Sequence, residues 1–297
     1  MERVSTFHHH FPSHPRPLST TLVKYLIGGI NYLSNKEIID QILKLRNISV
    51  LRSGVEVLDN ISIEVNKGDF VGLVGPNGGG KTSLLLTILG ELKPLKGDVI
   101  VYGHEPACRH NSGMVGWVPQ AAKNLSGNVH ISVRELINLG TLSKNNFLRR
   151  IDDNRRDKVD QAIKMVGLIG MEDVDVSRLS GGQLQRAVIG KALASESDFL
   201  LLDEPLVGVD RSSKNSLLKL LDDLCHHHGK TIIMVSHDLT AVTQSTHRII
   251  YLEKSIQFDG PSKELPDLND LAKIRGIVDP HSTHIHTHTT KLKTGDV

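Results

Sequence analysis

The sequence has few cysteines, few aromatic residues and almost no net charge. Cys108 and Cys225 are its two cysteines and lie far apart, which excludes a disulfide framework or a CxxC motif and suits a reducing cytosol. Lysine and arginine number 35 against 33 aspartates and glutamates. This balance gives no indication of a nucleic-acid or anionic-membrane partner. We therefore expect no nucleic acid among the partners.

Long hydrophobic runs are also absent. No stretch approaches the ~20 apolar residues that span a bilayer. The most apolar N-terminal stretch, residues 21–33, contains Lys24 and lacks a small-residue cleavage site, which argues against a secretory signal. The 297 residues are 39% hydrophobic and 23% charged, an ordinary composition for a soluble globular protein.

Composition divides the chain into three segments. Residues 1–42 are rich in proline and histidine and predict a flexible N-terminal extension, with one short helix over residues 35–42. Residues 43–253 have a globular composition. Residues 254–297 predict a C-terminal extension with one helix over residues 267–277 and a histidine-rich tail.

Apolar runs alternate with helical patterns through the central segment, which predicts an α/β fold with a parallel sheet. The expected strands cover residues 58–65, 70–75, 99–103, 199–203, 231–235 and 248–252. The expected helices cover residues 81–89, 133–139, 155–166, 212–227 and 239–245. Helices with charged faces predominate over about residues 122–180 and predict an inserted helical subdomain.

A glycine-rich string with the pattern GxxxxGK[ST] follows the predicted strand at residues 70–75 and opens the next helix, which is the context of a P-loop. Its glycines allow backbone N–H groups to approach a phosphate, and the helix N-terminus adds a favourable dipole. Lys81 would reach the β- and γ-phosphates, and Thr82 would bind Mg²⁺. The predicted nucleotide-binding residues of this loop are Gly75, Pro76, Asn77, Gly78, Gly79, Gly80, Lys81, Thr82 and Ser83.

Two carboxylates end the predicted strand at residues 199–203. Asp203 is placed to hold Mg²⁺, and Glu204, one residue later, is placed to polarise an attacking water. An acidic turn after a strand is ordinarily just solvated. Beside a P-loop, the same pair predicts nucleotide hydrolysis.

A second candidate anion site lies at the string LSGGQ, where a predicted helix begins. Its members are Ser180, Gly181, Gly182 and Gln183. The serine hydroxyl and the glycine amides at a helix start suit a phosphate. One nucleotide motif and two phosphate sites favour a head-to-tail dimer.

Together, the P-loop, the LSGGQ string and the Asp-Glu strand resemble the ATP-binding cassette (ABC) family over about residues 43–253. The resemblance implies a P-loop NTPase fold with a mixed parallel sheet, an antiparallel β subdomain and the inserted helical subdomain. It implies ATP and Mg²⁺ as cofactors, and ATP hydrolysis coupled to transport. By position, Gln120 matches the glutamine loop near the γ-phosphate and Mg²⁺. Asp210 matches the loop that crosses the dimer interface, and His237 matches the switch histidine at the γ-phosphate.

One position departs from the family pattern. The family usually stacks an aromatic residue on adenine near the start of the domain, but residues 33–69 contain no aromatic. Arg52 either supplies a guanidinium plane in its place or is simply solvated.

The resemblance is strongest to the branch that imports divalent metals such as zinc or manganese. It implies a second ATPase subunit in a homodimer, an integral membrane permease and an extracytoplasmic metal-binding protein. The chain would then be cytoplasmic and peripheral on the inner face of the cell membrane. Two alternatives remain: an importer of cobalamin or a siderophore, and a soluble ABC ATPase such as an iron–sulfur assembly factor.

Histidine is the one unusually frequent residue, with 16 in the chain. Eight of them lie in the two extensions, which either bind a metal such as Zn²⁺ or are inert low-complexity tails. His226, His227 and His228 follow Cys225 at a predicted helix end. They either form a metal site or simply complement the helix dipole.

Overall fold

The computed structural model describes residues 40–106, 108, 111, 113–120, 130–142 and 153–266. The described residues from Ile42 onward belong to one compact unit. Most of the predicted N-terminal extension, the helix over 267–277 and the C-terminal histidine tail lie outside the described residues. The helix predicted over 35–42 also lies outside them, except at its end, where strand β1 begins at Gln41.

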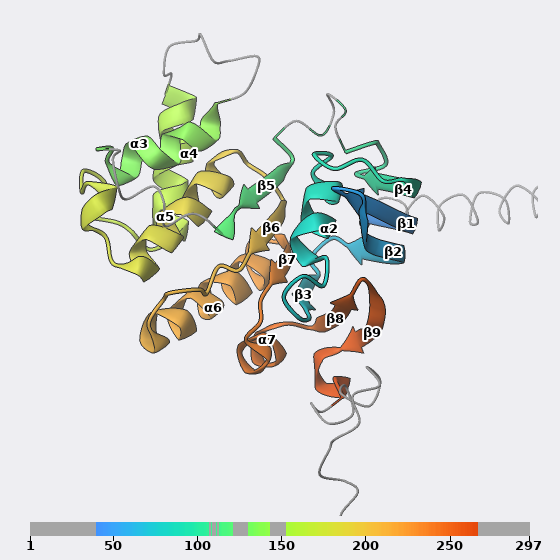
Figure 1. Ribbon diagram of the computed structural model, residues 1–297. Helices are drawn as coiled ribbons and strands as arrows, with labels where there is room; N and C mark the ends of the chain where they lie inside the picture. The colour runs from blue at the N-terminus through green and yellow to red at the C-terminus, as the bar shows by residue number, and fades with distance from the viewer. Residues whose placement is uncertain are drawn as a thin grey trace, which may run out of the picture. The chain divides into compact units, whose positions relative to one another are not determined.

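A six-stranded sheet forms the centre of the fold, in the order β5-β6-β7-β3-β8-β9 (Figure 1). Its first five strands pair in parallel, and β9 pairs antiparallel with β8. Short apolar runs such as FVGLV and FLLLD are buried throughout, as strands covered on both faces must be. The strands are β3 (Phe70–Val74), β5 (Val115–Val118), β6 (Phe199–Asp203), β7 (Thr231–Val235), β8 (Arg248–Glu253) and β9 (Ser255–Pro261).

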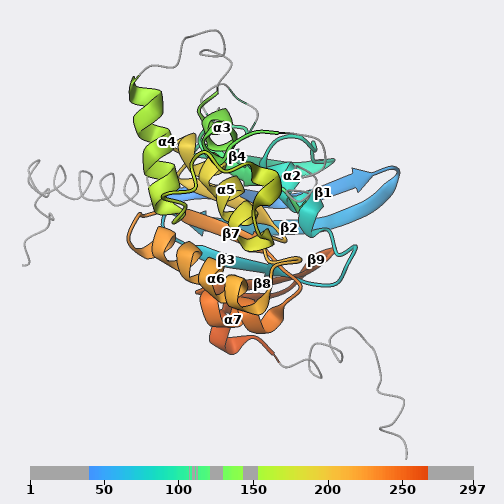
Figure 2. The ribbon, with the colours of Figure 1, turned by 90° about the vertical axis from the view of Figure 1, so that its left-hand side faces the viewer.

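The strand pleat sends alternate side chains into two separate cores. In β6, Leu200 and Leu202 join the core formed with the helices α5 (Gly181–Ala194), α6 (Arg211–His226) and α7 (Leu239–Ser245). Leu201 joins the core on the other face, with α2 (Lys81–Ile88) and the smaller sheet. Figure 1 shows α5, α6 and α7 on one side of the central sheet and α2 with the smaller sheet on the other, and Figure 2 looks onto the layer of α5 and α6. The layered arrangement leaves the carboxyl ends of the parallel strands free to carry a site.

A three-stranded sheet with the order β2-β1-β4 lies over α2. Its strands are β1 (Gln41–Arg52), β2 (Val55–Asn66) and β4 (Lys96–Val101), and β1 pairs antiparallel with β4. The β1–β2 hairpin turns at Ser53 and Gly54, whose φ values of 52° and 79° fit the two-residue turn that matches strand twist. The expected antiparallel β subdomain is therefore present, and β1 is a strand that the sequence patterns do not predict.

A helical region separates β5 from β6. The short helix α3 (Val133–Asn138) and α4 (Asp153–Met165) both pack on α5. A capping box begins α3, in which Ser132 and Glu135 bond to each other's backbone N–H groups. Both helices fall within the 122–180 range expected for a helical subdomain.

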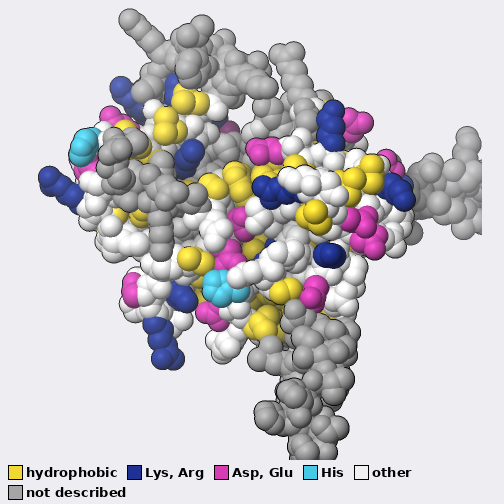
Figure 3. Space-filling model, in the orientation of Figure 1, with side chains coloured by type: hydrophobic (Ala, Val, Ile, Leu, Met, Phe, Trp, Pro, Cys, Tyr) yellow, Lys and Arg dark blue, Asp and Glu magenta, His cyan; other side chains and the backbone are white. Residues whose placement is uncertain are grey.

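The central sheet continues past residue 253, where the sequence places the end of the cassette. β9 pairs with β8 from Ser255 to Pro261, so the C-terminal boundary of this sheet lies beyond the predicted one. Within the described ranges, no helix has the length and apolarity needed to cross a bilayer. On the face shown in Figure 3, acidic and basic side chains of the described residues are interspersed.

Candidate functional site

The glycine-rich loop leaves the carboxyl end of β3, between β7 and β8. Glycine is required at two of its positions. A Cβ on Gly75 would lie 2.0 Å from the Leu252 carbonyl oxygen, and one on Gly80 would lie 2.5 Å from the Val57 carbonyl oxygen. Their φ values of 147° and 96° also fall in the region that disfavours side chains. Neighbouring backbone therefore approaches the loop closely at these two glycines.

Lys81 is the first residue of α2, and its side chain turns back into the loop. Its Nζ donates hydrogen bonds to the carbonyl oxygens of Gly75 at 3.0 Å and Pro76 at 2.8 Å. The residue is only 7% exposed. Burial lowers the pKa of Lys81, while the nearby charges of Glu204 and Asp203 oppose that shift. The loop thus encloses a positive charge at the N-terminus of a helix, which suits a phosphate.

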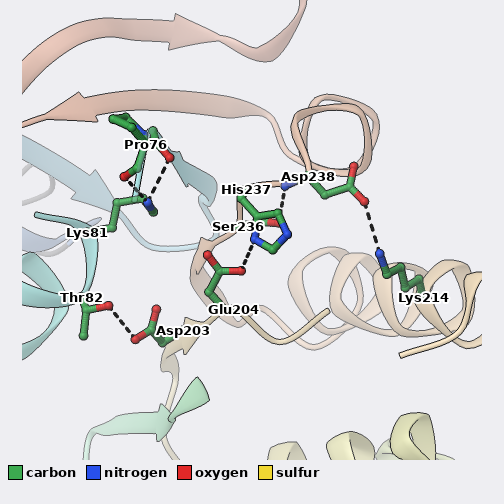
Figure 4. A network of polar contacts seen from close by, with 10 residues as sticks. Pro76, Lys81, Thr82, Asp203, Glu204, Lys214, Ser236, His237 and Asp238 are labelled. Atoms are coloured by element: carbon green, nitrogen blue, oxygen red, sulfur yellow. Dashed lines mark hydrogen bonds and ion pairs between the residues drawn. The ribbon is translucent and has the colours of Figure 1, made fainter. Parts of the chain in front are cut away.

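Thr82 and Asp203 meet where α2 begins and β6 ends. The Thr82 hydroxyl donates a hydrogen bond to Asp203 Oδ2 at 2.9 Å, as Figure 4 shows. Asp203 is 3% exposed, and its Oδ1 is buried without a hydrogen-bond partner. Burial raises the pKa of this carboxyl, against the hydrogen bond from Thr82. A buried carboxylate oxygen without a partner, beside a threonine hydroxyl, fits the hydrated Mg²⁺ that accompanies a nucleotide.

Glu204 and His237 face each other across the ends of β6 and β7 (Figure 4). His237 Nδ1 lies 2.6 Å from Glu204 Oε2. The carboxylate is nearly buried, with 10% of its side chain exposed, whereas the imidazole is 62% exposed. Glu204 has an unusual positive φ of 53°, and its N–H donates to the Val235 carbonyl. This left-handed conformation of a non-glycine residue directs the Glu204 side chain toward His237 at the strand end.

A cavity of about 290 Å³ opens over the loop. It brings together residues that the sequence places up to 183 positions apart, from Arg52 to Val235. From the predicted set, its lining contains Asn77, Gly78, Gly80, Lys81, Thr82, Ser83, Gln120 and Glu204. Arg52, the residue considered in place of the missing aromatic, lines the same cavity together with Val57 and Val235.

The LSGGQ string lies outside this cavity. Ser180 caps α5 and forms a capping box with Gln183. A Cβ on Gly182 would lie 2.6 Å from Ser213 Cβ, so the start of α5 packs on the start of α6. Asp210 caps α6 by accepting from the Ser213 N–H at 3.0 Å. The second anion site and the Asp210 loop are therefore neighbours, and neither lines the P-loop cavity of the same chain.

Sequence patterns do not indicate the backbone contacts that Leu252 and Lys254 make with the glycine-rich loop. Besides the close approach of Leu252, the Lys254 N–H donates to the Gly79 carbonyl at 3.0 Å. Val57 and Val235 are likewise unpredicted members of the cavity wall. Contacts made through backbone atoms leave no residue signature, so no motif could have indicated them.

The side chains of the candidate metal site at the end of α6 do not meet at one position. His227 Nδ1 lies 2.8 Å from Asp223 Oδ1, and His228 lies near the same carboxylate. Cys225 is buried, and its Sγ donates to the Gly68 carbonyl at 3.0 Å. These three side chains therefore form no common metal site.

The family model for ABC transporters matches residues 58–207. The chain belongs to this family and is an ATP-binding cassette ATPase. It is 33% identical to the zinc uptake system ATP-binding protein ZurA of Listeria innocua, over 76% of this chain and 88% of that protein. It is also 33% identical to the high-affinity zinc uptake system ATP-binding protein ZnuC of Bacillus subtilis, over 72% of this chain and 91% of that one.

A solved structure confirms the fold. The chain superposes on cbiO1 from Clostridium perfringens, part of the ABC transporter complex cbiONQ, with a TM-score of 0.69 and 26% identity. The match covers 79% of this chain and 94% of that one. The predicted ABC ATPase fold is therefore confirmed, including its mixed sheet.

Proposed function

We propose that this chain is the ATP-hydrolysing subunit of an ABC importer for a divalent metal ion, zinc or manganese. The observation that supports hydrolysis is the convergence of Lys81, Thr82 and Glu204 on one cavity, with Asp203 hydrogen-bonded to Thr82 beside it. The observation that supports the cargo is the similarity to relatives named as zinc uptake ATP-binding proteins. Measurement of uptake by the purified complex distinguishes this cargo from cobalamin or a siderophore.

The predicted residues of the site have the following proposed tasks. The backbone of residues 75–83 surrounds the phosphates, and Lys81 neutralises the β- and γ-phosphates. Thr82, Asp203 and Gln120 would hold Mg²⁺, which supplies charge neutralisation between the phosphates when bound. Glu204 accepts the proton of the attacking water, and His237 contacts the γ-phosphate and holds it in position. Positioning and charge stabilisation then carry most of the rate enhancement.

We further propose that a second copy of the cassette completes each site. Ser180–Gln183 lie outside the cavity of their own chain, yet they have the composition of a phosphate site at a helix start. In a head-to-tail dimer they would face the nucleotide on the partner, with Asp210 at the interface. ATP would then close the dimer and hydrolysis would reopen it.

The transporter reading requires a separate permease, an extracytoplasmic metal-binding protein and a position on the inner face of the membrane. The experiment is affinity purification of the chain from native membranes, with partners identified by mass spectrometry. A polytopic membrane protein in equal ratio supports the proposal. Recovery with soluble partners alone would overturn it and favour a soluble ABC ATPase.

Cargo is tested on the purified complex in proteoliposomes. We expect ATP-dependent uptake of Zn²⁺ or Mn²⁺, lost when Glu204→Gln replaces the wild-type chain. Glu196→Gln is the matched control, because Glu196 also has a positive φ, of 61°, and pairs with Lys158 away from the cavity. Uptake of cobalamin or a siderophore without uptake of either metal would refute the metal assignment.

A further inference from the structure

Two histidines outside the nucleotide site, distant in sequence, lie together on the surface. His226 ends α6, and His247 follows α7 immediately before β8. Their Nε2 atoms are 3.1 Å apart, and their ring planes cross at 87°. Both residues are exposed. α6 and α7 pack on each other, and Figures 1 and 2 both show them side by side.

The hydrogen bonds of His226 determine which of its nitrogens carries a lone pair. Its Nδ1 lies 3.0 Å from the Asp222 carbonyl oxygen and 3.1 Å from Asp222 Oδ1. Both oxygens only accept, so Nδ1 carries the proton and donates. The Nε2 of the neutral ring is then unprotonated and free to bind a cation. A histidine oriented in this way by a carboxylate or a carbonyl is the common form of a metal-binding histidine.

The separation of the two Nε2 atoms matches a metal-ligand geometry. Two imidazole nitrogens at ~2.0–2.1 Å from a tetrahedral zinc ion are about 3.3 Å apart. The observed 3.1 Å lies within a few tenths of an ångström of that value. The ring planes are perpendicular, so the two imidazoles meet edge-on and do not stack.

We propose that His226 and His247 bind a divalent transition-metal ion of the zinc, nickel or copper kind through their Nε2 atoms, with Asp222 orienting His226. Imidazole selects these ions over Mg²⁺ or Ca²⁺, which prefer oxygen. The described part of the chain contains no cluster of three or more His, Cys, Asp or Glu side chains able to hold a metal. Water therefore completes the coordination. Asp222 also lines a hollow of about 320 Å³ between α6 and α7, which gives solvent access.

The proposed ion would link two helices whose other ends adjoin residues of the predicted site, Asp210 and His237. Asp210 caps α6, and α7 follows directly after His237. Lys214 and Asp238, 3.5 Å apart, already join the N-terminal parts of the two helices. An ion at His226 and His247 would fasten their C-terminal ends as well. The site lies apart from the ATP cavity, and its failure would leave the proposed importer function intact.

Isothermal titration of the full-length protein with ZnCl₂ at pH 7.5 tests the site. His226→Ala/His247→Ala is compared with the matched control His227→Ala/His228→Ala, so that zinc bound elsewhere contributes equally to both. We expect the first variant to lose one equivalent of bound Zn²⁺ and the control to keep it. Asp222→Asn should retain the equivalent with an affinity about tenfold weaker, the lower end of the range for an orienting partner.

Two outcomes overturn the proposal. Retention of the equivalent by both double variants would reduce the histidine pair to a hydrogen bond. Loss of the equivalent by both would show that Zn²⁺ binds the surface histidines without selection. If circular dichroism shows that the first variant does not fold, His247→Gln alone replaces it. That variant removes one nitrogen ligand, and an unchanged isotherm would then also overturn the proposal.

Discussion

Replacing Glu204 by glutamine separates ATP hydrolysis from ATP binding. Glutamine has nearly the same shape, and the positive φ of Glu204, 53°, is set by the backbone bond to Val235. The amide oxygen can still accept from His237 Nδ1. The substitution therefore leaves the cavity in place and removes one negative charge and one base.

The expected magnitude follows from the loss of a general base. Proton transfer by a positioned side chain contributes roughly 10²–10⁴-fold to a rate. At about 1.36 kcal/mol per tenfold change, the barrier should rise by roughly 2.7–5.4 kcal/mol. ATP binding should be retained, because Lys81 and the loop glycines are untouched.

Steady-state release of inorganic phosphate and titration with ATP measure the two effects separately. Glu196→Gln makes the same chemical change in another left-handed backbone position, φ 61°, away from the cavity, and should leave both quantities at the wild-type level. A turnover of Glu204→Gln close to that of the wild type would remove Glu204 from the role of general base.

Three further predictions concern Arg52 in the cavity wall, Gly80 in the glycine-rich loop and Asp210 at the proposed dimer interface. Arg52→Ala should raise the Kd for ATP by roughly twofold to fivefold, the equivalent of about 0.5–1 kcal/mol for an exposed guanidinium stacking on a base; an unchanged Kd would leave Arg52 solvated. Gly80→Ala should lower the free energy of unfolding by about 1–3 kcal/mol, measured by denaturant titration, because its Cβ would lie 2.5 Å from the Val57 carbonyl oxygen. Gly54→Ala meets no atom within 4 Å, so an equal loss there would assign the effect to φ alone. For Asp210, hydrogen bonds from Ser212 and Ser213 hold the carboxyl pKa in the folded state well below its ordinary value. The resulting stabilisation is complete above the ordinary pKa and is lost progressively as the pH falls from there toward the lowered pKa of the folded state. The Tm difference between the wild type and Asp210→Asn should therefore shrink from pH 7 to pH 3, and a constant difference would contradict the assignment.

The strands and helices that carry the motifs were predictable because their patterns are local. FVGLV, FLLLD and TIIMV are continuous apolar runs, and each forms a buried strand of the central sheet. The helix predicted over 239–245 has the same bounds as α7. The sequence patterns do not predict strands β1, β5 and β9. β5 has only four residues, β1 mixes exposed and buried positions without a clean alternation, and β9 has only exposed and partly buried positions. β1 is placed by its pairing with β4, and β9 by its pairing with the adjacent strand β8.

The candidate site likewise contains residues that motifs predict and contacts that they do not. Motif residues such as Lys81 and Glu204 were predictable because phosphate chemistry restricts the residue type at each position. Leu252 and Lys254 support the loop through backbone atoms, and backbone atoms are common to every residue type. The pairing of His226 with His247 depends on how α6 and α7 pack, so the sequence pattern indicates only the adjacent histidines 226–228.

The support of the glycine-rich loop by Leu252 and Lys254 has a consequence for synthesis on the ribosome. β3 is bounded by β7 and β8, and Lys254 lies 180 residues after Val74. Because the ribosome adds about 5–20 residues per second, roughly 9–36 s pass between synthesis of the loop and synthesis of the last residues that contact it. For most of that time both edges of β3 lack their partners, because β7 covers Thr231–Val235 and β8 covers Arg248–Glu253. A nonsense codon after residue 210 would yield a nascent chain that carries both glycine motifs but has no cavity for a nucleotide.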